Sequence, residues 1–339
     1  MNRRRKSIAR LGLWLTLFCA FSLLSLHWGI SLPAPILAQA GLTPRAYLPY
    51  ISAAEESVTP PPPGDWLAYV NYQRALAELP AVTENPTWSD GDQKHAKYMV
   101  KNDFIGHDED PGQPFYTPEG QLAAQNSNVM VSSNTGITDN EAIDLWMEGP
   151  FHAVGVIDPA LLQAGFGSYR EADGGWQMAA ALDVLRGLGS IPASVTFPIK
   201  WPSDGMTTLQ RAYGGSELPD PLTGCPGYTA PSGLPIILQI GPGNLTPNVA
   251  AHSFTQGATP LEHCVFDETS YANPDGSLQS LGRAILGSRD AIVLIPRAPL
   301  AMGATYTVSI TANGQTYTWS FTVSSAAQTT ETTPHTLIR

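Results

Sequence analysis

Residues 141–167 read EAIDLWMEGPFHAVGVIDPALLQAGFG, and the first half of the chain is organised around this stretch. Ala142 and Trp146 recur at the spacing of an amphipathic helix. The Gly-Pro pair at 149–150 predicts the end of that helix, because proline cannot continue its hydrogen bonding. His152 follows at the stop, where rigid turns would hold its ring beside a cleft. The alternative is a histidine bonded to a nearby carbonyl.

Further short motifs run in a fixed order on both sides of this stretch. They are Asn71, Arg74, Leu79-Pro80, Val82, His95-Ala96, Met99, Asn102, Phe104, His107, Trp146, Gly149-Pro150, His152 and Gly165-Phe166-Gly167. In this order and spacing, residues 64–188 resemble bacterial members of the CAP superfamily, which includes cysteine-rich secretory, antigen 5 and pathogenesis-related proteins. The resemblance implies an α+β fold, a three-layer α-β-α sandwich, in which His107 and His152 line one cavity.

The family's cavity motif is only partly present. Gln125 and Asn126 align with its Gly-Glu-Asn motif, so both are cavity candidates, but glutamine replaces the glutamate. A second glutamate of many family members falls on Gly149. Glu109, Glu119 and Glu148 are the candidates to replace the missing carboxylates, and Glu119 ranks first because it lies in a turn. The alternative for each is a solvated surface carboxylate.

Two histidines on facing walls could bind a divalent cation such as Zn²⁺ weakly. We therefore expect His107 and His152 to approach each other across one cleft, with Asn126 nearby. Water and one carboxylate would complete the shell, and no other cofactor is expected. His95 is interpreted as a partly exposed helix residue.

The first 63 residues are typical of an exported protein. A basic start, an apolar run over 11–32 and the Ala-Gln-Ala motif at 38–40 predict a signal peptide over 1–40. The alternative is an uncleaved anchor, since the run is long enough to span a bilayer. The proline-rich residues 41–63 predict a stalk. We expect the protein to be secreted, with membrane contact only if cleavage fails.

The net charge of −11 disfavours some partners. An acidic surface repels nucleic acid and anionic membranes, so neither is expected as a partner.

The pattern of apolar and turn-forming residues changes after residue 188. Alternating apolar residues in 305–323, with Asn313-Gly314 between them, predict a β-hairpin. No helical period is evident, and residues 189–325 are interpreted as an all-β sandwich. Residues 299–300, 305–308 and 319–321 resemble bacterial Ig-like domains. Residues 326–339 are expected to form a disordered tail.

Cys225 and Cys264 are the two cysteines outside the signal segment. An even pair in an exported protein predicts a disulfide, and the alternative is two reduced thiols too far apart to bridge. His252, His263 and Cys264 show no ligand spacing that would indicate a metal site.

Three classes of function remain open. The family resemblance implies a secreted binding protein for a small apolar, lipid or cell-surface ligand. The second class is a structural envelope or adhesion protein. The third is a hydrolase using His107 and His152, but the chain has no Gly-x-Ser-x-Gly elbow and no catalytic residue is assigned.

Overall fold

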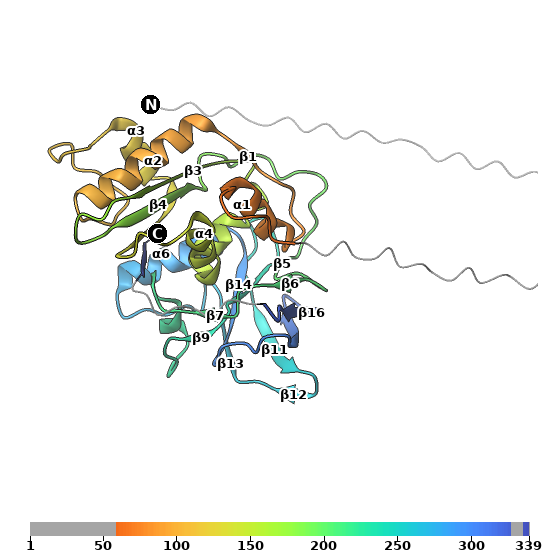
Figure 1. Cartoon of the computed structure of the whole chain (residues 1–339). Helices are drawn as coiled ribbons and strands as arrows, with labels where there is room; N and C mark the ends of the chain where they lie inside the picture. Colours follow the sequence, from red (N-terminus) through yellow and green to blue (C-terminus); the bar gives the residue numbers. More distant parts are fainter. Residues whose placement is uncertain (1–58, 327–334, 339) are drawn as a thin grey trace, which may run out of the picture. The chain divides into compact units, whose positions relative to one another are not determined.

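The computed structural model describes residues 59–326 and 335–338 (Figure 1). The predicted signal peptide, and the predicted stalk up to residue 58, lie outside the described residues. All described residues belong to one compact unit. Within these two ranges, no helix is both long and apolar enough to cross a membrane.

The first region contains helices and most of one sheet (Figure 1). Its helices are α1 (Trp66–Ala75), α2 (Pro86–Lys101), α3 (Pro118–Ala124), α4 (Asp139–Glu148) and α5 (Pro150–Val156). Its strands are β1 (Thr83–Glu84), β2 (Ser127–Ser132), β3 (Gln163–Arg170) and β4 (Met178–Asp183). The strand order is β1-β3-β4-β2, and every pair except the parallel β1/β3 is antiparallel.

Helices cover both faces of this sheet. Along β4, Ala179 and Ala181 pack with Met99 of α2 in one small core. The alternate residues of β4, such as Leu182, face the other side of the sheet and pack into a larger core with Trp146 of α4. Because strand side chains alternate between faces, one strand supplies both cores. The region is a helix–sheet–helix arrangement, in agreement with the α+β expectation.

Neighbouring residues explain where α4 begins and how it passes into α5. Thr138 and Glu141 form a capping box that starts α4. Gly149 ends α4, as predicted, but Pro150 then begins the next helix. Proline suits a first helical position, where its missing N–H would have no partner in the helix. His152 therefore lies inside the first turn of α5.

The second region is built mainly from short strands. They are β5 (Ile199–Trp201), β6 (Thr207–Thr208), β7 (Ala212–Tyr213), β8 (Glu217–Leu218), β9 (Ser232–Gly233), β10 (Ile236–Gln239), β11 (Val249–Gln256), β12 (Thr259–Pro260), β13 (His263–Phe266), β14 (Ala291–Pro296), β15 (Thr305–Ala312) and β16 (Gln315–Val323). One sheet has the order β13-β14-β10-β5, another has β12-β11-β15-β16-β6, and β7 pairs with β9. The predicted hairpin is confirmed as β15–β16. Asn313 and Gly314 both have positive φ, as a type I′ turn requires.

Two features of the C-terminal half differ from expectation. Helix α6 (Gly276–Gly287) lies between β13 and β14, so the region is not all-β. Its three glycines weaken the helical signal, although Asp275 caps its start. Strand β17 (His335–Ile338) pairs with β2 and β8, so these four residues are not the disordered tail that was expected. Two neighbouring strands supply the backbone partners that hold such a segment.

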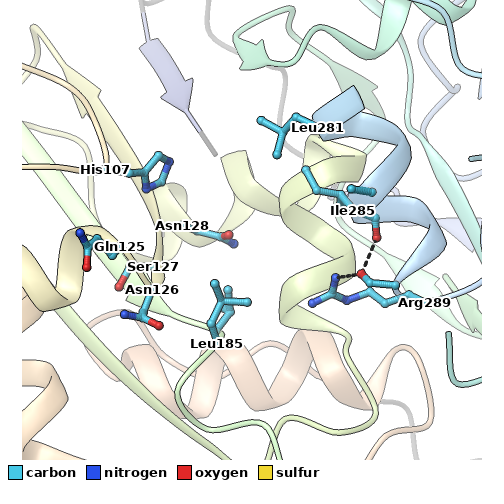
Figure 2. Close-up of a pocket in the computed structure, with 12 residues that line it drawn as sticks. His107, Gln125, Asn126, Ser127, Asn128, Leu185, Leu281, Ile285 and Arg289 are labelled. Atoms are coloured by element: carbon cyan, nitrogen blue, oxygen red, sulfur yellow. Dashed lines mark hydrogen bonds between the residues drawn. The ribbon is translucent and has the colours of Figure 1, made fainter. Parts of the chain in front are cut away.

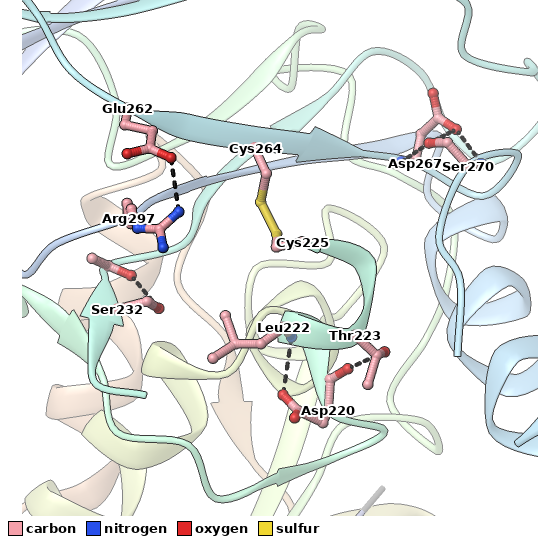
Figure 3. Close-up of a disulfide and its surroundings, with 11 residues drawn as sticks. Asp220, Leu222, Thr223, Cys225, Ser232, Glu262, Cys264, Asp267, Ser270 and Arg297 are labelled. Carbon is pink, nitrogen blue, oxygen red and sulfur yellow. Dashed lines mark hydrogen bonds and ion pairs between the residues drawn. A yellow bond between two sulfur atoms is a disulfide. The ribbon is translucent and has the colours of Figure 1, made fainter. Parts of the chain in front are cut away.

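The predicted disulfide between Cys225 and Cys264 is confirmed (Figure 3). The two Cα atoms are 5.6 Å apart, which suits a disulfide. It joins the end of the 3-10 turn η1 (Pro221–Gly224) to β13.

A continuous core crosses the boundary predicted between residues 188 and 189. Phe151 of α5 packs against Tyr271 and Phe266, with ring centroids 5.0 and 6.3 Å away. Strand β17, in turn, links β2 of the first region to β8 of the second. The two regions therefore share packing, while the boundary itself and the Ig-like assignment stay predictions.

Candidate functional site

A pocket of about 340 Å³ lies between the first region and α6 (Figure 2). Polar groups come from the loop after α2 and from the turn between α3 and β2, and apolar groups come from α6 and from the end of β4. The lining residues are His107, Gln125, Asn126, Ser127, Asn128, Val184, Leu185, Leu281, Ala284, Ile285, Ser288 and Arg289.

Backbone carbonyls orient the polar side of the pocket. The His107 ring has its Nδ1 2.8 Å from the carbonyl of Ala124. Because a carbonyl only accepts, Nδ1 carries the hydrogen. Asn126 Nδ2 donates to the carbonyl of Leu122 at 2.8 Å, next to the same turn. The pocket thus brings together three predicted cavity residues: His107, Gln125 and Asn126.

The apolar side is open to solvent at its edge. Leu185 is 39% exposed and Leu281 is 38% exposed. Behind them Val184 and Ile285 are buried. Exposed large apolar side chains beside a pocket are typical of a surface that binds an apolar group.

Arg289 fixes the end of α6 against the first region. Its Nε lies 2.9 Å from Asp158 Oδ2, and both side chains are almost fully buried. Burial lowers the pKa of Arg289, and the charge of Asp158 acts in the opposite direction. The pair holds the apolar wall of the pocket in place.

His152 lies behind this pocket and is not among its lining residues. The carbonyl of His152 accepts a hydrogen bond from Asn128 Nδ2 at 3.2 Å, and Asn128 is a lining residue. The His152 ring is fully buried, and its Nδ1 lies 2.6 Å from Glu217 Oε1. The same oxygen accepts from the His152 peptide N–H at 2.8 Å.

Gly149 makes room for this carboxylate. A Cβ atom at position 149 would come within 2.7 Å of the Glu217 carboxyl carbon. The glycine thus serves the close approach of Glu217 as well as the turn between two helices.

The three predicted replacement carboxylates lie elsewhere, and none is a lining residue. Glu109 is buried and faces His95, with Oε1 3.0 Å from Nδ1. His95 is fully buried, so the expectation of a partly exposed residue was wrong. Glu119 is exposed and lies 3.4 Å from Lys94. Burial, followed by the charge of Asp144, raises the pKa of Glu148.

The sequence analysis missed Glu217 and the apolar wall from α6. Glu217 lies 65 residues after His152, in a region with no recognised motif. No short sequence pattern predicts the contact between Glu217 and His152 or the contribution of α6 to the pocket.

The ion shared by His107 and His152 stays a prediction. Across residues 59–326 and 335–338, no group of three or more His, Cys, Asp or Glu side chains could hold a metal ion. The predicted site would therefore rely on water for most of its shell.

Comparison with known proteins identifies the first region. Residues 67–178 match the family model described as CAP, the cysteine-rich secretory protein family. No curated protein and no solved structure matches the chain. The chain thus carries a CAP domain over this segment, as the ordered motifs predicted.

Proposed function

We propose that this CAP-domain protein is an extracellular binding module, and that its pocket takes a small, largely apolar ligand with one polar end. The CAP match supports an extracellular binding class in general terms. The disulfide is also typical of an oxidising compartment. The predicted signal peptide, with a mature chain beginning at Gly41, belongs to the same proposal.

One observation carries the proposal. Apolar side chains of α6 and of the end of β4 share a pocket with His107 and three side-chain amides. Ligand sites of small molecules are mostly apolar, with a few polar groups that fix orientation. A volume of about 340 Å³ suits a small molecule or the end of a longer chain.

We expect Asn128 to form a hydrogen bond with the polar end of the ligand. Its Oδ1 is buried and has no hydrogen-bond partner among the described residues. Its Nδ2 is committed to the carbonyl of His152. A buried acceptor without a partner costs free energy, so a ligand hydroxyl that donates to it would be favoured. The expected ligand is therefore an apolar molecule ending in a hydroxyl group.

A binding titration tests the proposal. The full chain is titrated with a fluorescent sterol and with a fluorescent fatty alcohol. Leu281→Glu places a charge at the pocket edge and should weaken binding at least about tenfold, since burying a charge in an apolar site is costly. Leu122→Glu is the matched control, because Leu122 is 48% exposed and is not a lining residue. Equal affinity in both variants, or no binding by the native chain, would refute the proposal.

The second region would present this module, and we propose that it is Ig-like. Its two larger sheets and the β15–β16 hairpin support that assignment. Intact mass of the exported protein tests the proposed processing, because cleavage after Ala40 removes residues 1–40.

A further inference from the structure

We propose that His252 and His263 form a second binding site, for a divalent copper or nickel ion, on the outer part of the second region. The pocket between the first region and α6 includes neither residue. The sequence spacing gave no sign of this site, because the two histidines come from different sheets.

The two rings meet through their nitrogens. His252 Nδ1 lies 2.8 Å from His263 Nε2. The ring centroids are 4.9 Å apart and the ring planes cross at 80°. His252 extends from β11, and His263 begins β13.

The hydrogen-bond network fixes the tautomers. His263 Nδ1 lies 2.8 Å from the carbonyl of Leu261, so this nitrogen carries the hydrogen. In the neutral ring, His263 Nε2 then has a free lone pair and accepts from His252 Nδ1. A histidine whose other N–H donates to a backbone carbonyl is in the state typical of a metal ligand.

Metal binding would replace the hydrogen between the two rings. The hydrogen on His252 Nδ1 moves to Nε2 of the same ring through solvent, because His252 is exposed. Both facing nitrogens then carry lone pairs.

Imidazole nitrogens bind Cu²⁺ more tightly than the other divalent ions of the first row, and tetragonal geometry is typical of Cu²⁺ and Ni²⁺. In that geometry two ligands at right angles, each about 2.0 Å from the ion, lie about 2.8 Å apart. The two nitrogens are 2.8 Å apart here because they share a hydrogen bond, so they are already close enough to meet at one ion. The rings must turn so that both lone pairs point to one ion, and the exposed His252 can do so.

The backbone under the pair is well fixed. The next residue, Cys264, is held by the disulfide (Figure 3). Strand β13 also pairs with β14 along its length. His252 pairs with Ile310 in the ladder between β11 and β15. The Phe254 ring also packs edge-on against His263. Ligands held in place by the fold lose less freedom on binding, which favours a chelate.

Water would complete the coordination shell. A polar hollow of about 460 Å³ lies beside His252 and includes Asp267. Asp267 Oδ1 accepts hydrogen bonds from the peptide N–H groups of Thr269 and Ser270. The hollow leaves room for water on the open side of the ion.

Copper binding to the full chain tests the site. Titration with Cu²⁺ gives the affinity, and electron paramagnetic resonance counts the coordinating nitrogens. We expect a two-nitrogen signal at pH 7.5. His252→Ala and His263→Ala should each weaken this binding at least about tenfold and change the signal, since even the loss of an outer partner costs 10–100-fold.

Ser253→Ala is the matched control, because Ser253 is the exposed next residue on β11 and strand neighbours point to opposite faces. It should bind Cu²⁺ like the native chain. An ion bound by His107 and His152 would still bind to the His252→Ala and His263→Ala variants. Binding that neither variant affects would therefore be assigned to that other site. A native Cu²⁺ affinity that both histidine variants retain would overturn the proposal, as would a one-nitrogen signal.

Discussion

Glu217 Oε1 accepts two hydrogen bonds from His152, one from the ring Nδ1 at 2.6 Å and one from the peptide N–H at 2.8 Å. Neither side chain is exposed. His152 lies in the first turn of α5, whose N-cap residue Gly149 provides no side-chain hydrogen bond. Glu217 thus supplies the acceptor that a capping side chain would otherwise give, and its negative charge suits the helix start.

Substitutions of Glu217 should separate its hydrogen bonding from its charge. Glu217→Leu leaves the buried ring N–H of His152 without this acceptor, at roughly 1–3 kcal/mol. The peptide N–H keeps the carbonyl of Gly149 at 3.1 Å, so its loss should be smaller. Glu217→Gln keeps a carbonyl oxygen in the same place and should lose less than half as much. Urea denaturation gives both free energies of unfolding. Similar losses in the two variants would mean that the charge, rather than the hydrogen bonds, matters.

Gly149→Ala tests the same contact from the other side. The added Cβ would come within 2.7 Å of the Glu217 carboxyl carbon, so we expect a loss of about 1–3 kcal/mol from overpacking. Gly276→Ala is the control, because a Cβ there meets nothing within 4 Å and Gly276 opens helix α6. Thermal denaturation should show a lower melting temperature for the first variant alone.

These contacts show which parts of the fold the sequence could predict. The helix stop at Gly149 and the turn at Asn313-Gly314 depend on neighbouring residues, so both were predictable. Glu217 depends on a contact across 65 residues, which no local pattern encodes. Helix α6 was missed because its glycines dilute the helical signal, and with it the apolar wall of the pocket was missed.

Asp144 should make stability depend on pH. Burial raises the pKa of Asp144 to about 7, although hydrogen bonds from Tyr69 and Gln210 lower it and the charge of Glu141 raises it further. An unfolded aspartate titrates near 3.9. The folded protein therefore binds this proton more tightly than the unfolded chain does. The stabilisation that Asp144 gives to the folded state is complete below about pH 4 and is lost as pH rises to about 7.

Asp144→Asn removes this dependence. Between pH 4 and pH 7 the variant should gain stability relative to the native chain, on the order of a few kcal/mol. Above pH 7 the difference in stability between the two should stay constant. Denaturation at several pH values measures the difference. The control is Glu262→Gln, whose exposed carboxylate pairs with Arg297. Parallel pH profiles for Asp144→Asn and the native chain would contradict the assignment.

The disulfide should stabilise the second region. Cys225 and Cys264 are 39 residues apart, and closing a loop of that length stabilises the fold by about 4 kcal/mol in the chain-entropy treatment. The double variant Cys225→Ala/Cys264→Ala should lose about that amount in a denaturation experiment. Reductant should lower the native stability to a similar level and leave the variant unaffected. If reductant frees both thiols of the native chain without lowering its free energy of unfolding, this expectation is contradicted.

The shared core makes a specific prediction about proteolysis. A cut in 187–192 would separate the CAP domain from the second region in sequence, yet three kinds of contact would still join the fragments. Phe151 packs against Tyr271, Arg289 pairs with Asp158, and His152 bonds to Glu217. All three interactions are buried, so breaking them leaves unpaired charges and exposed apolar surface. We therefore expect the nicked protein to elute as one species in size-exclusion chromatography and to separate only in denaturant.

Residues 59–188 produced alone provide the stricter test of this shared core. This segment lacks Glu217, Tyr271 and the Arg289 partner of Asp158, so buried groups of α5 would face water or lose their partners. We expect a lower melting temperature than that of the full chain, together with binding of a dye specific for exposed apolar surface. Adding residues 189–339 in trans should reverse both effects. A segment that melts cooperatively at the temperature of the full chain would instead establish two independent domains and restore the predicted boundary after residue 188.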